Sequence, residues 1–79
     1  MSDVYDRLVT LLTSTVGLQK HEIEPDRTFN DLEVDSLALV ELTLVAQKEF
    51  GVPLSDEELS PWDTIAQAAK IIERKGVKI

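Results

Sequence analysis

The segment from Ser36 to Phe50 restricts the fold of this chain more than any other part of the sequence. It is strongly apolar, Asp35 or Ser36 can cap a helix at its start, and Gly51 can end one. At helical spacing its apolar residues fall on two sides of the helix. The side expected in the core carries Leu39, Leu42, Thr43, Ala46 and Phe50. The other side, here called the docking strip, carries Leu37, Val40 and Leu44. Because a chain of 79 residues has difficulty burying both sides, we expect the docking strip to face partners.

The remaining segments predict an all-α fold. Apolar residues recur at helical spacing from Val4 to Val16, and Gly17 is a natural stop. Residues 18–35 show no sustained period and contain Pro25, so we expect a long loop that apolar residues pin across the helices.

Two capping boxes mark the elements that follow. Ser55 with Glu58 predicts a short third helix, which ends by the residue before Pro61. Thr64 with Gln67 predicts the start of a last helix. Since no segment shows convincing strand alternation, we expect a small four-helix bundle with three main helices, one short helix and a long first loop.

The composition excludes several classes of site and of partner. Without cysteine the chain has no disulfides and no thiolate metal sites, and its acids fail the spacing of a calcium loop, so we expect no metal site. It has no stretch long enough to span a membrane and no signal pattern, so we expect a soluble, cytoplasmic protein. The length predicts one domain over residues 1–79, and the charge and small size favour a monomer. The net charge is −7, with the acids concentrated between residues 20 and 63. Such a surface disfavours nucleic acid and anionic lipid, and it suits basic patches on partner proteins.

Ser36 stands where an acidic stretch meets the apolar helix, so its hydroxyl would lie at a helix N-terminus. The unpaired N–H groups and the dipole of a helix favour an anion there, which suits an attached phosphodiester. From the residues alone, three roles are open: a helix cap, a nucleophile with His21 as its base, and an acceptor of a modification. The chain lacks a Gly-x-Ser-x-Gly motif, and we expect His21 to be a solvated loop residue.

The sequence around Ser36 resembles the phosphopantetheine attachment site of acyl carrier proteins. The resemblance rests on Asp35-Ser36-Leu37 together with Phe29-x-x-Leu32, Val40-Glu41-Leu42, Phe50-Gly51-Val52 and Thr64-Ile65. It extends over nearly all of the chain, so the motif is supported by its context.

The resemblance implies that Ser36 carries a covalent 4'-phosphopantetheine, which a phosphopantetheinyl transferase moves from coenzyme A to the serine hydroxyl. It also implies that Asp35 helps the transferase to hold Mg²⁺ and coenzyme A, and that Leu37 is the hydrophobic neighbour of the site. The thiol of the arm would hold acyl groups as thioesters for acyl-loading, acyl-transfer or synthase enzymes. The chain would then be a carrier and not an enzyme.

Two further groups of residues follow from the expected fold. Docking is expected to use the docking strip together with acids of the second and third helices, namely Glu41, Asp56, Glu57 and Glu58. An acyl cleft between the second and last helices would be lined by Leu39, Leu42, Ala46, Ile65, Ala68, Ala69 and Ile72. The same small and apolar residues could instead form a closed core.

The chain departs from the family pattern in two places. Glu33 stands where many members have glycine, and because glutamate tolerates positive φ poorly, we expect a slightly different turn. The second helix has Ala38, Gln47 and Lys48 where carriers of primary fatty-acid synthesis commonly have acids. This favours a specialised pathway such as polyketide or lipopeptide assembly over fatty-acid synthesis, with drift on an exposed face as the other explanation. A peptidyl or aryl carrier and an unmodified helical adaptor remain as alternatives.

Overall fold

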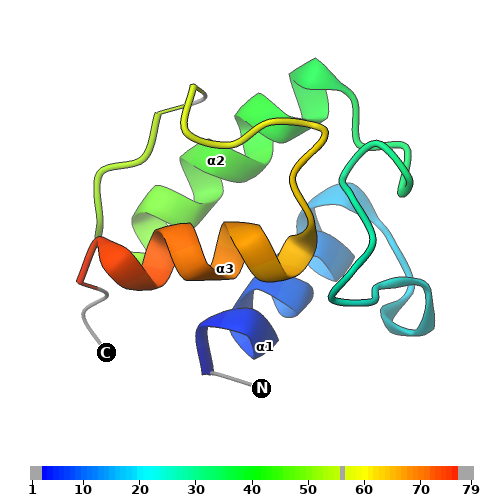
Figure 1. Ribbon diagram of the computed structural model, residues 1–79, viewed down its shortest axis with the longest axis horizontal. Coiled ribbons are helices and arrows are strands. Elements are labelled where there is room, and N and C mark those ends of the chain that lie inside the picture. The colour runs from blue at the N-terminus through cyan, green and yellow to red at the C-terminus, as the bar shows by residue number, and fades with distance from the viewer. Residues whose placement is uncertain (1–2, 56, 77–79) are drawn as a thin grey trace.

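The computed structural model of the chain describes residues 3–55 and 57–76. Within that part it has three α-helices, α1 (Asp3–Leu11), α2 (Ser36–Phe50) and α3 (Ile65–Arg74). Two shorter turns lie between α1 and α2, namely the π-helical η1 (Leu12–Val16) and the 3₁₀ turn η2 (Lys20–Glu22). In Figure 1, α3 passes in front of α2, and α1 lies below both helices. The predicted all-α class is therefore confirmed.

The first predicted helix changes its winding partway along. α1 buries the face that its spacing predicts, which consists of Val4, Tyr5, Leu8, Val9 and Leu11. Beyond α1 the chain continues as η1, and Gly17 ends it with a φ of 84°. Hydroxyl side chains in this segment bind helix carbonyls: Thr13 Oγ1 donates to the Thr10 carbonyl at 2.7 Å, and Ser14 Oγ donates to the Leu11 carbonyl at 3.4 Å. These bonds compete with the regular α-helical ladder, which gives a reason for the change.

α2 has the predicted bounds and the predicted core side. Asp35 Oδ1 accepts a hydrogen bond from the Ala38 N–H at 2.8 Å, and Gly51, with a φ of 66°, ends the helix. The buried residues are Leu39, Leu42, Thr43, Ala46 and Phe50. The Thr43 hydroxyl donates to the Leu39 carbonyl at 2.8 Å, so this polar group has a partner inside the core.

The predicted short helix is not formed between α2 and α3, where the described residues make turns. The predicted pair does interact, because the Ser55 N–H donates to Glu58 Oε1 at 3.2 Å and the Glu58 N–H donates to the Ser55 carbonyl at 3.1 Å. Leu54 and Leu59 on either side of this turn are buried in the core, and Pro61 follows soon after. A single turn held at both ends by core contacts does not extend into a helix, because nucleation is costly and little length is available to repay it.

The long first loop pairs with the segment that enters α3. Four backbone hydrogen bonds of 2.7–3.2 Å join residues 25–30 to residues 61–66, and an isolated antiparallel bridge links Thr28 to Thr64. Apolar side chains of the loop are buried as predicted, namely Ile23, Phe29, Leu32 and Val34. The pairing holds the two segments that lead into α2 and α3 side by side, at the right end of the molecule in Figure 1.

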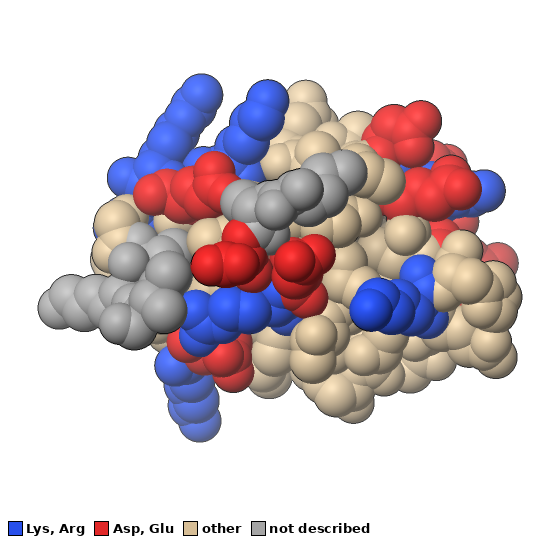
Figure 2. Space-filling model, turned by 90° about the horizontal axis from the view of Figure 1, so that it is seen from below, with Lys and Arg blue, Asp and Glu red and all other residues tan. Residues whose placement is uncertain are grey.

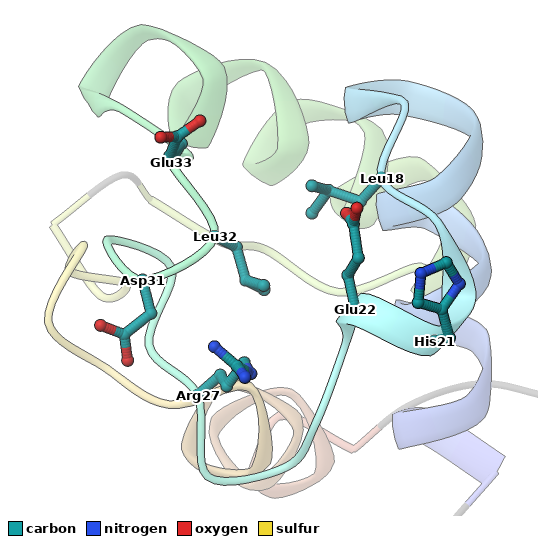
Figure 3. Close-up of a pocket in the computed structure, with 7 residues that line it drawn as sticks. All are labelled: Leu18, His21, Glu22, Arg27, Asp31, Leu32 and Glu33. Carbon is teal, nitrogen blue, oxygen red and sulfur yellow. The ribbon is translucent and has the colours of Figure 1, made fainter.

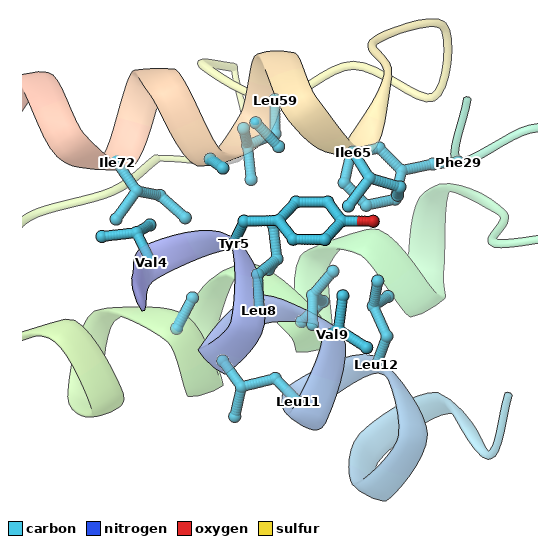
Figure 4. Packing of buried hydrophobic residues seen from close by; sticks show 14 of the residues in the cluster. Val4, Tyr5, Leu8, Val9, Leu11, Leu12, Phe29, Leu59, Ile65 and Ile72 are labelled. Carbon is cyan, nitrogen blue, oxygen red and sulfur yellow. The ribbon is translucent and has the colours of Figure 1, made fainter. Parts of the chain in front are cut away.

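One hydrophobic core joins the three helices and the first loop. Figure 4 shows the Tyr5 ring of α1 next to Ile65 of α3 and Phe29 of the first loop. Leu8 of α1 and Ile72 of α3 belong to the same cluster. Most of these side chains are wholly buried. The core therefore fixes the position from which α2 begins.

A polar contact joins α1 to the far end of α2. The Arg7 guanidinium lies 2.6 Å from Glu49 Oε2, donates to the Glu49 carbonyl at 2.8 Å and lies 4.8 Å from the centre of the Phe50 ring. Because the arginine also packs on an aromatic face, the contact combines a charge pair with a cation–π interaction.

Candidate functional site

Ser36 is the first residue of α2 and is exposed. The helix is capped by Asp35, whose carboxylate accepts from the Ala38 N–H, so the cap is not the serine. Within the described residues, the Ser36 hydroxyl has no hydrogen-bond partner. Its side chain is therefore not used by the helix and is accessible at the positive end of the helix dipole.

The turn that leads to Ser36 contains a strained residue. Glu33 has a φ of 61°, which is the left-handed region that glycine enters freely and glutamate does not. Its N–H donates to the Asn30 carbonyl at 3.0 Å, and the Val34 N–H donates to the Phe29 carbonyl at 2.9 Å. These bonds, together with the burial of Val34, hold Glu33 at a positive φ. Glycine would adopt this conformation more easily, as the sequence comparison with the family pattern led us to expect.

A small hollow opens beside Ser36. Its volume is about 200 Å³, and it is lined by Ser36, Leu39, Val40, Leu59 and Pro61. A second hollow of about 270 Å³ is lined by Val40, Thr43, Leu44, Gln47, Leu54 and Ser55. Since Val40 lines both, the two hollows follow one another along α2, between this helix and the segment that leads to α3.

The predicted acyl-cleft residues all lie in the core. Leu39, Leu42, Ala46, Ile65, Ala68, Ala69 and Ile72 are at most 4% exposed. Among them, Leu39 alone also lines the hollow beside Ser36. Leu39 therefore lies at the boundary between that hollow and the core.

The predicted docking residues have different surroundings. Leu37 and Leu44 are 71% and 56% exposed, whereas Val40 is half-buried between the two hollows. Glu41 and Glu57 are exposed, and Asp56 lies outside the described residues. Glu58 pairs with Lys75, and this hydrogen bond, followed by that from the Ser55 N–H, holds the pKa of Glu58 below its ordinary value.

Sequence reasoning did not single out Trp62. This residue is 71% exposed and follows Pro61, which lines the hollow beside Ser36. It belongs to a turn rather than to a helix, so no hydrophobic period pointed to it. Its signal in the sequence is that it is the single tryptophan of the chain and lies just before a predicted helix.

A larger hollow of about 420 Å³ lies under the first loop, and Ser36 is not among the residues that line it. Figure 3 shows Leu18 and Leu32 pointing into it, with His21, Glu22, Arg27, Asp31 and Glu33 around them. Figure 2 shows several acidic side chains at the end of the molecule formed by this loop, on the right in both views. His21 is exposed on η2 and, within the described part, has no hydrogen bond to Ser36. The pair therefore lacks the contact that a serine nucleophile and its base require.

The described residues offer neither a cluster of metal ligands nor a membrane-spanning helix. They contain no group of three or more His, Asp or Glu side chains positioned to hold a metal ion. No helix among them is long and apolar enough to cross a membrane.

The exposed serine at a helix N-terminus fits a covalently attached phosphodiester, and comparison with known proteins points to the same group. Residues 6–72 match the family model described as a phosphopantetheine attachment site. A protein from Petrotoga mobilis named acyl carrier protein is 32% identical over 74 residues, which cover 92% of this chain and 87% of that protein. The acyl carrier protein of Thermobifida fusca is 30% identical over 73 residues, covering 91% of this chain and 92% of its own. That of Acidothermus cellulolyticus is 30% identical over 76 residues, covering 95% and 90%.

Proposed function

The chain belongs to the acyl carrier proteins, whose shared domain is a phosphopantetheine attachment site, and we propose that Ser36 is the residue that carries the arm. The observation behind this proposal is the division of roles at the start of α2. Asp35 caps the helix, and the exposed Ser36 hydroxyl has no partner within the described residues. A hydroxyl that the helix does not need is available for modification.

Attachment requires one bond to form and one to break. Ser36 Oγ bonds to the phosphorus that bears pantetheine in coenzyme A, the phosphoanhydride bond breaks, adenosine bisphosphate leaves, and the hydroxyl proton passes to a base of the transferase. The first N–H groups of α2 favour the anionic phosphodiester that results. Asp35 uses Oδ1 for the cap, which leaves Oδ2 for the Mg²⁺ that the transferase holds. The attached arm supplies a thiol on which acyl groups are held as thioesters.

In this proposal the chain presents cargo, and partner enzymes perform the chemistry. Partners with basic patches dock on the docking strip and on the exposed acids Glu41 and Glu57, with the monomeric chain acting as one carrier domain over residues 1–79. Glu58 contributes less to docking because its charge is already paired with Lys75. The scarcity of acids on α2 supports a specialised pathway, such as polyketide or lipopeptide assembly, over primary fatty-acid synthesis.

We further propose that longer acyl groups enter through the hollow beside Ser36 and reach the seven core residues named above. The support is that Leu39 lines this hollow and is also part of the core. Burial of a chain there removes apolar surface from water, so an octanoyl group should raise the melting temperature above that of the acetyl form. Equal melting temperatures would place the acyl chain outside the core.

A peptidyl or aryl carrier is the alternative within the same family, and Asp35 before the serine argues against it. Competitive loading separates the two. The Ser36-modified chain should accept fatty-acyl or malonyl groups and not amino acids or aryl acids from their activating enzymes. The reverse preference would favour the alternative.

The attachment is tested by intact-mass spectrometry. The wild-type chain is incubated with coenzyme A, Mg²⁺ and a broad-specificity phosphopantetheinyl transferase, beside Ser36→Ala and Ser55→Ala variants. We expect the mass gain of one phosphopantetheine on the wild type and on Ser55→Ala, and none on Ser36→Ala. No gain on a folded wild type, with the transferase active on another carrier, would favour the unmodified adaptor.

A further inference from the structure

Trp62 is presented to solvent on an ordered turn. Its side chain is 71% exposed, although tryptophan has the largest apolar surface that a residue can bury. The Ser60 hydroxyl accepts from the Trp62 N–H at 3.2 Å, the Asp63 N–H donates to the Ser60 carbonyl at 3.0 Å, and Asp63 Oδ2 accepts from the Ser60 N–H at 2.9 Å. The turn therefore holds its own backbone without using the indole.

The turn is also fixed to the first loop on both sides of Trp62. The Asn30 N–H donates to the Pro61 carbonyl at 2.7 Å, and the Phe29 N–H donates to the Asp63 carbonyl at 3.2 Å. Phe29 is fully buried, so these bonds attach the turn to the core. An aromatic side chain on such a support loses little backbone freedom when a partner covers it, which is a property of interface anchors.

Trp62 lies at the same end of the molecule as Ser36. Pro61, one peptide bond before it, lines the hollow that also contains Ser36. Figure 1 shows the segment that enters α3 running beside the start of α2. Leu37, which follows the serine, is likewise 71% exposed, so two large apolar side chains belong to the surface around the attachment point.

We propose that Trp62 is an anchor for the phosphopantetheinyl transferase, and this inference rests on the proposed attachment at Ser36. The transferase must bring its reacting phosphorus within bonding distance of a hydroxyl that lies directly on the start of α2. Its surface therefore covers the residues around Ser36, including the turn that follows Pro61. Enzymes that act on the thiol work at the far end of the arm, so their docking on Leu37, Val40 and Leu44 does not require contact with Trp62.

The charges on the approach to Ser36 agree with this occupant. Glu33 and Asp35, on the approach to Ser36, are both exposed carboxylates. A transferase that binds coenzyme A, an anionic substrate, carries basic groups at its active site. An apolar pocket with a basic rim complements the exposed indole and these carboxylates.

Steady-state kinetics of the modification test the anchor. Trp62→Ala should raise the KM of the transferase for the chain by about tenfold, with kcat changed far less, because an anchor acts on association. Trp62→Phe should keep most of the affinity. Gln47→Ala, a neutral substitution about three turns further along α2, should leave KM unchanged. Circular dichroism checks that all three variants fold.

Fluorine NMR supplies a readout that does not depend on turnover. Because Trp62 is the single tryptophan, 5-fluorotryptophan labels one site, and the Ser36→Ala chain can be titrated with transferase without reacting. We expect a saturable shift or broadening of this resonance. A resonance that does not move at saturation, or an unchanged KM for Trp62→Ala, would overturn the anchor. So would a shift that depends on chain concentration alone, which would assign the indole to a second copy. The wild-type mass gain is measured separately, so the anchor can fail while attachment at Ser36 stands.

Discussion

The carboxylate of Asp35 and the hydroxyl of Ser36 adjoin one another at the start of α2, but the helix uses the carboxylate alone. From the sequence either residue could cap the helix, because both types do so well. The backbone settles the choice, since Asp35 has extended angles and Ser36 is already helical. At the residue scale, the capping role therefore belongs to Asp35, and the Ser36 hydroxyl is left free of it.

Removal of the cap should cost stability without touching the serine. Asp35→Ala should lower the free energy of unfolding by about 1 kcal/mol, whereas Asp35→Asn should stay within about 0.5 kcal/mol of the wild type, because asparagine caps as well. Urea denaturation followed by circular dichroism measures both. If Asp35 also helps to hold Mg²⁺, both variants should be modified more slowly. An equal loss of stability in Asp35→Asn and Asp35→Ala would contradict the capping role.

Relief of the strained turn should stabilise the chain. With a φ of 61°, Glu33 occupies a region that costs a non-glycine residue about 1–2 kcal/mol, while glycine adds about 0.5–1 kcal/mol of chain entropy to the unfolded state. Glu33→Gly should therefore raise the free energy of unfolding by about 0.5–1 kcal/mol. Glu33→Ala removes the same charge but keeps the strain, and Glu57→Gly places glycine in another exposed turn position. A Glu33→Gly chain no more stable than Glu33→Ala would contradict this explanation.

At the scale of elements, the contacts between segments distant in sequence were harder to predict than the helices. α2 and α3 could be predicted because capping residues and glycines mark their ends, as Asp35, Gly51 and Thr64 illustrate. The pairing of residues 25–30 with 61–66 uses backbone groups, so no side-chain pattern predicts it. For the same reason, the sequence did not predict the turn that carries Trp62. The short helix predicted at Ser55 was wrong because a capping box specifies a first turn and not its continuation.

The pair between Glu58 and Lys75 joins the segment before α3 to the end of that helix, and it should show a defined pH dependence. The hydrogen bond from Lys75 lowers the pKa of Glu58 from its ordinary 4.5, so its contribution to stability is present above pH 4.5 and is lost as the pH falls through the lowered pKa. Glu58→Gln should therefore melt below the wild type at neutral pH, and the gap should close in acid. Melting curves of both proteins between neutral pH and about pH 3 measure this. A gap that does not change with pH would contradict the ion pair.

At the scale of the whole molecule, one core lies beneath a surface on which acids outnumber bases. The net charge is −7, and the exposed acids Asp31, Glu33 and Asp35 lie on the segment that leads to Ser36. The core composition was predictable, because helical spacing identified Leu8, Leu42 and Ile72 as inward residues. Neither the hollow beside Ser36 nor its relation to Pro61 could be read from spacing, since both depend on how α2 and the segment before α3 pack.

Electrostatic attraction should make the modification sensitive to salt. Raising the ionic strength from about 0.05 M to about 0.5 M shortens the screening length severalfold, so kcat/KM of the transferase for this chain should fall, mainly through KM. A modified chain with Glu41 and Glu57 changed to Gln should show a weaker dependence in the acyl-transfer steps of its partners. A kcat/KM that does not change with salt would contradict charge-guided docking.

The most direct test of the account loads the chain from acetyl-coenzyme A with a transferase and follows the intact mass over time. We predict a gain of one acetylated arm on the wild type and none on Ser36→Ala. The acetyl group should persist during incubation and leave on treatment with hydroxylamine, so that the mass falls to that of the chain with the free arm. A gain on Ser36→Ala, or rapid loss of the acetyl group that His21→Ala prevents, would contradict a non-catalytic carrier modified at Ser36.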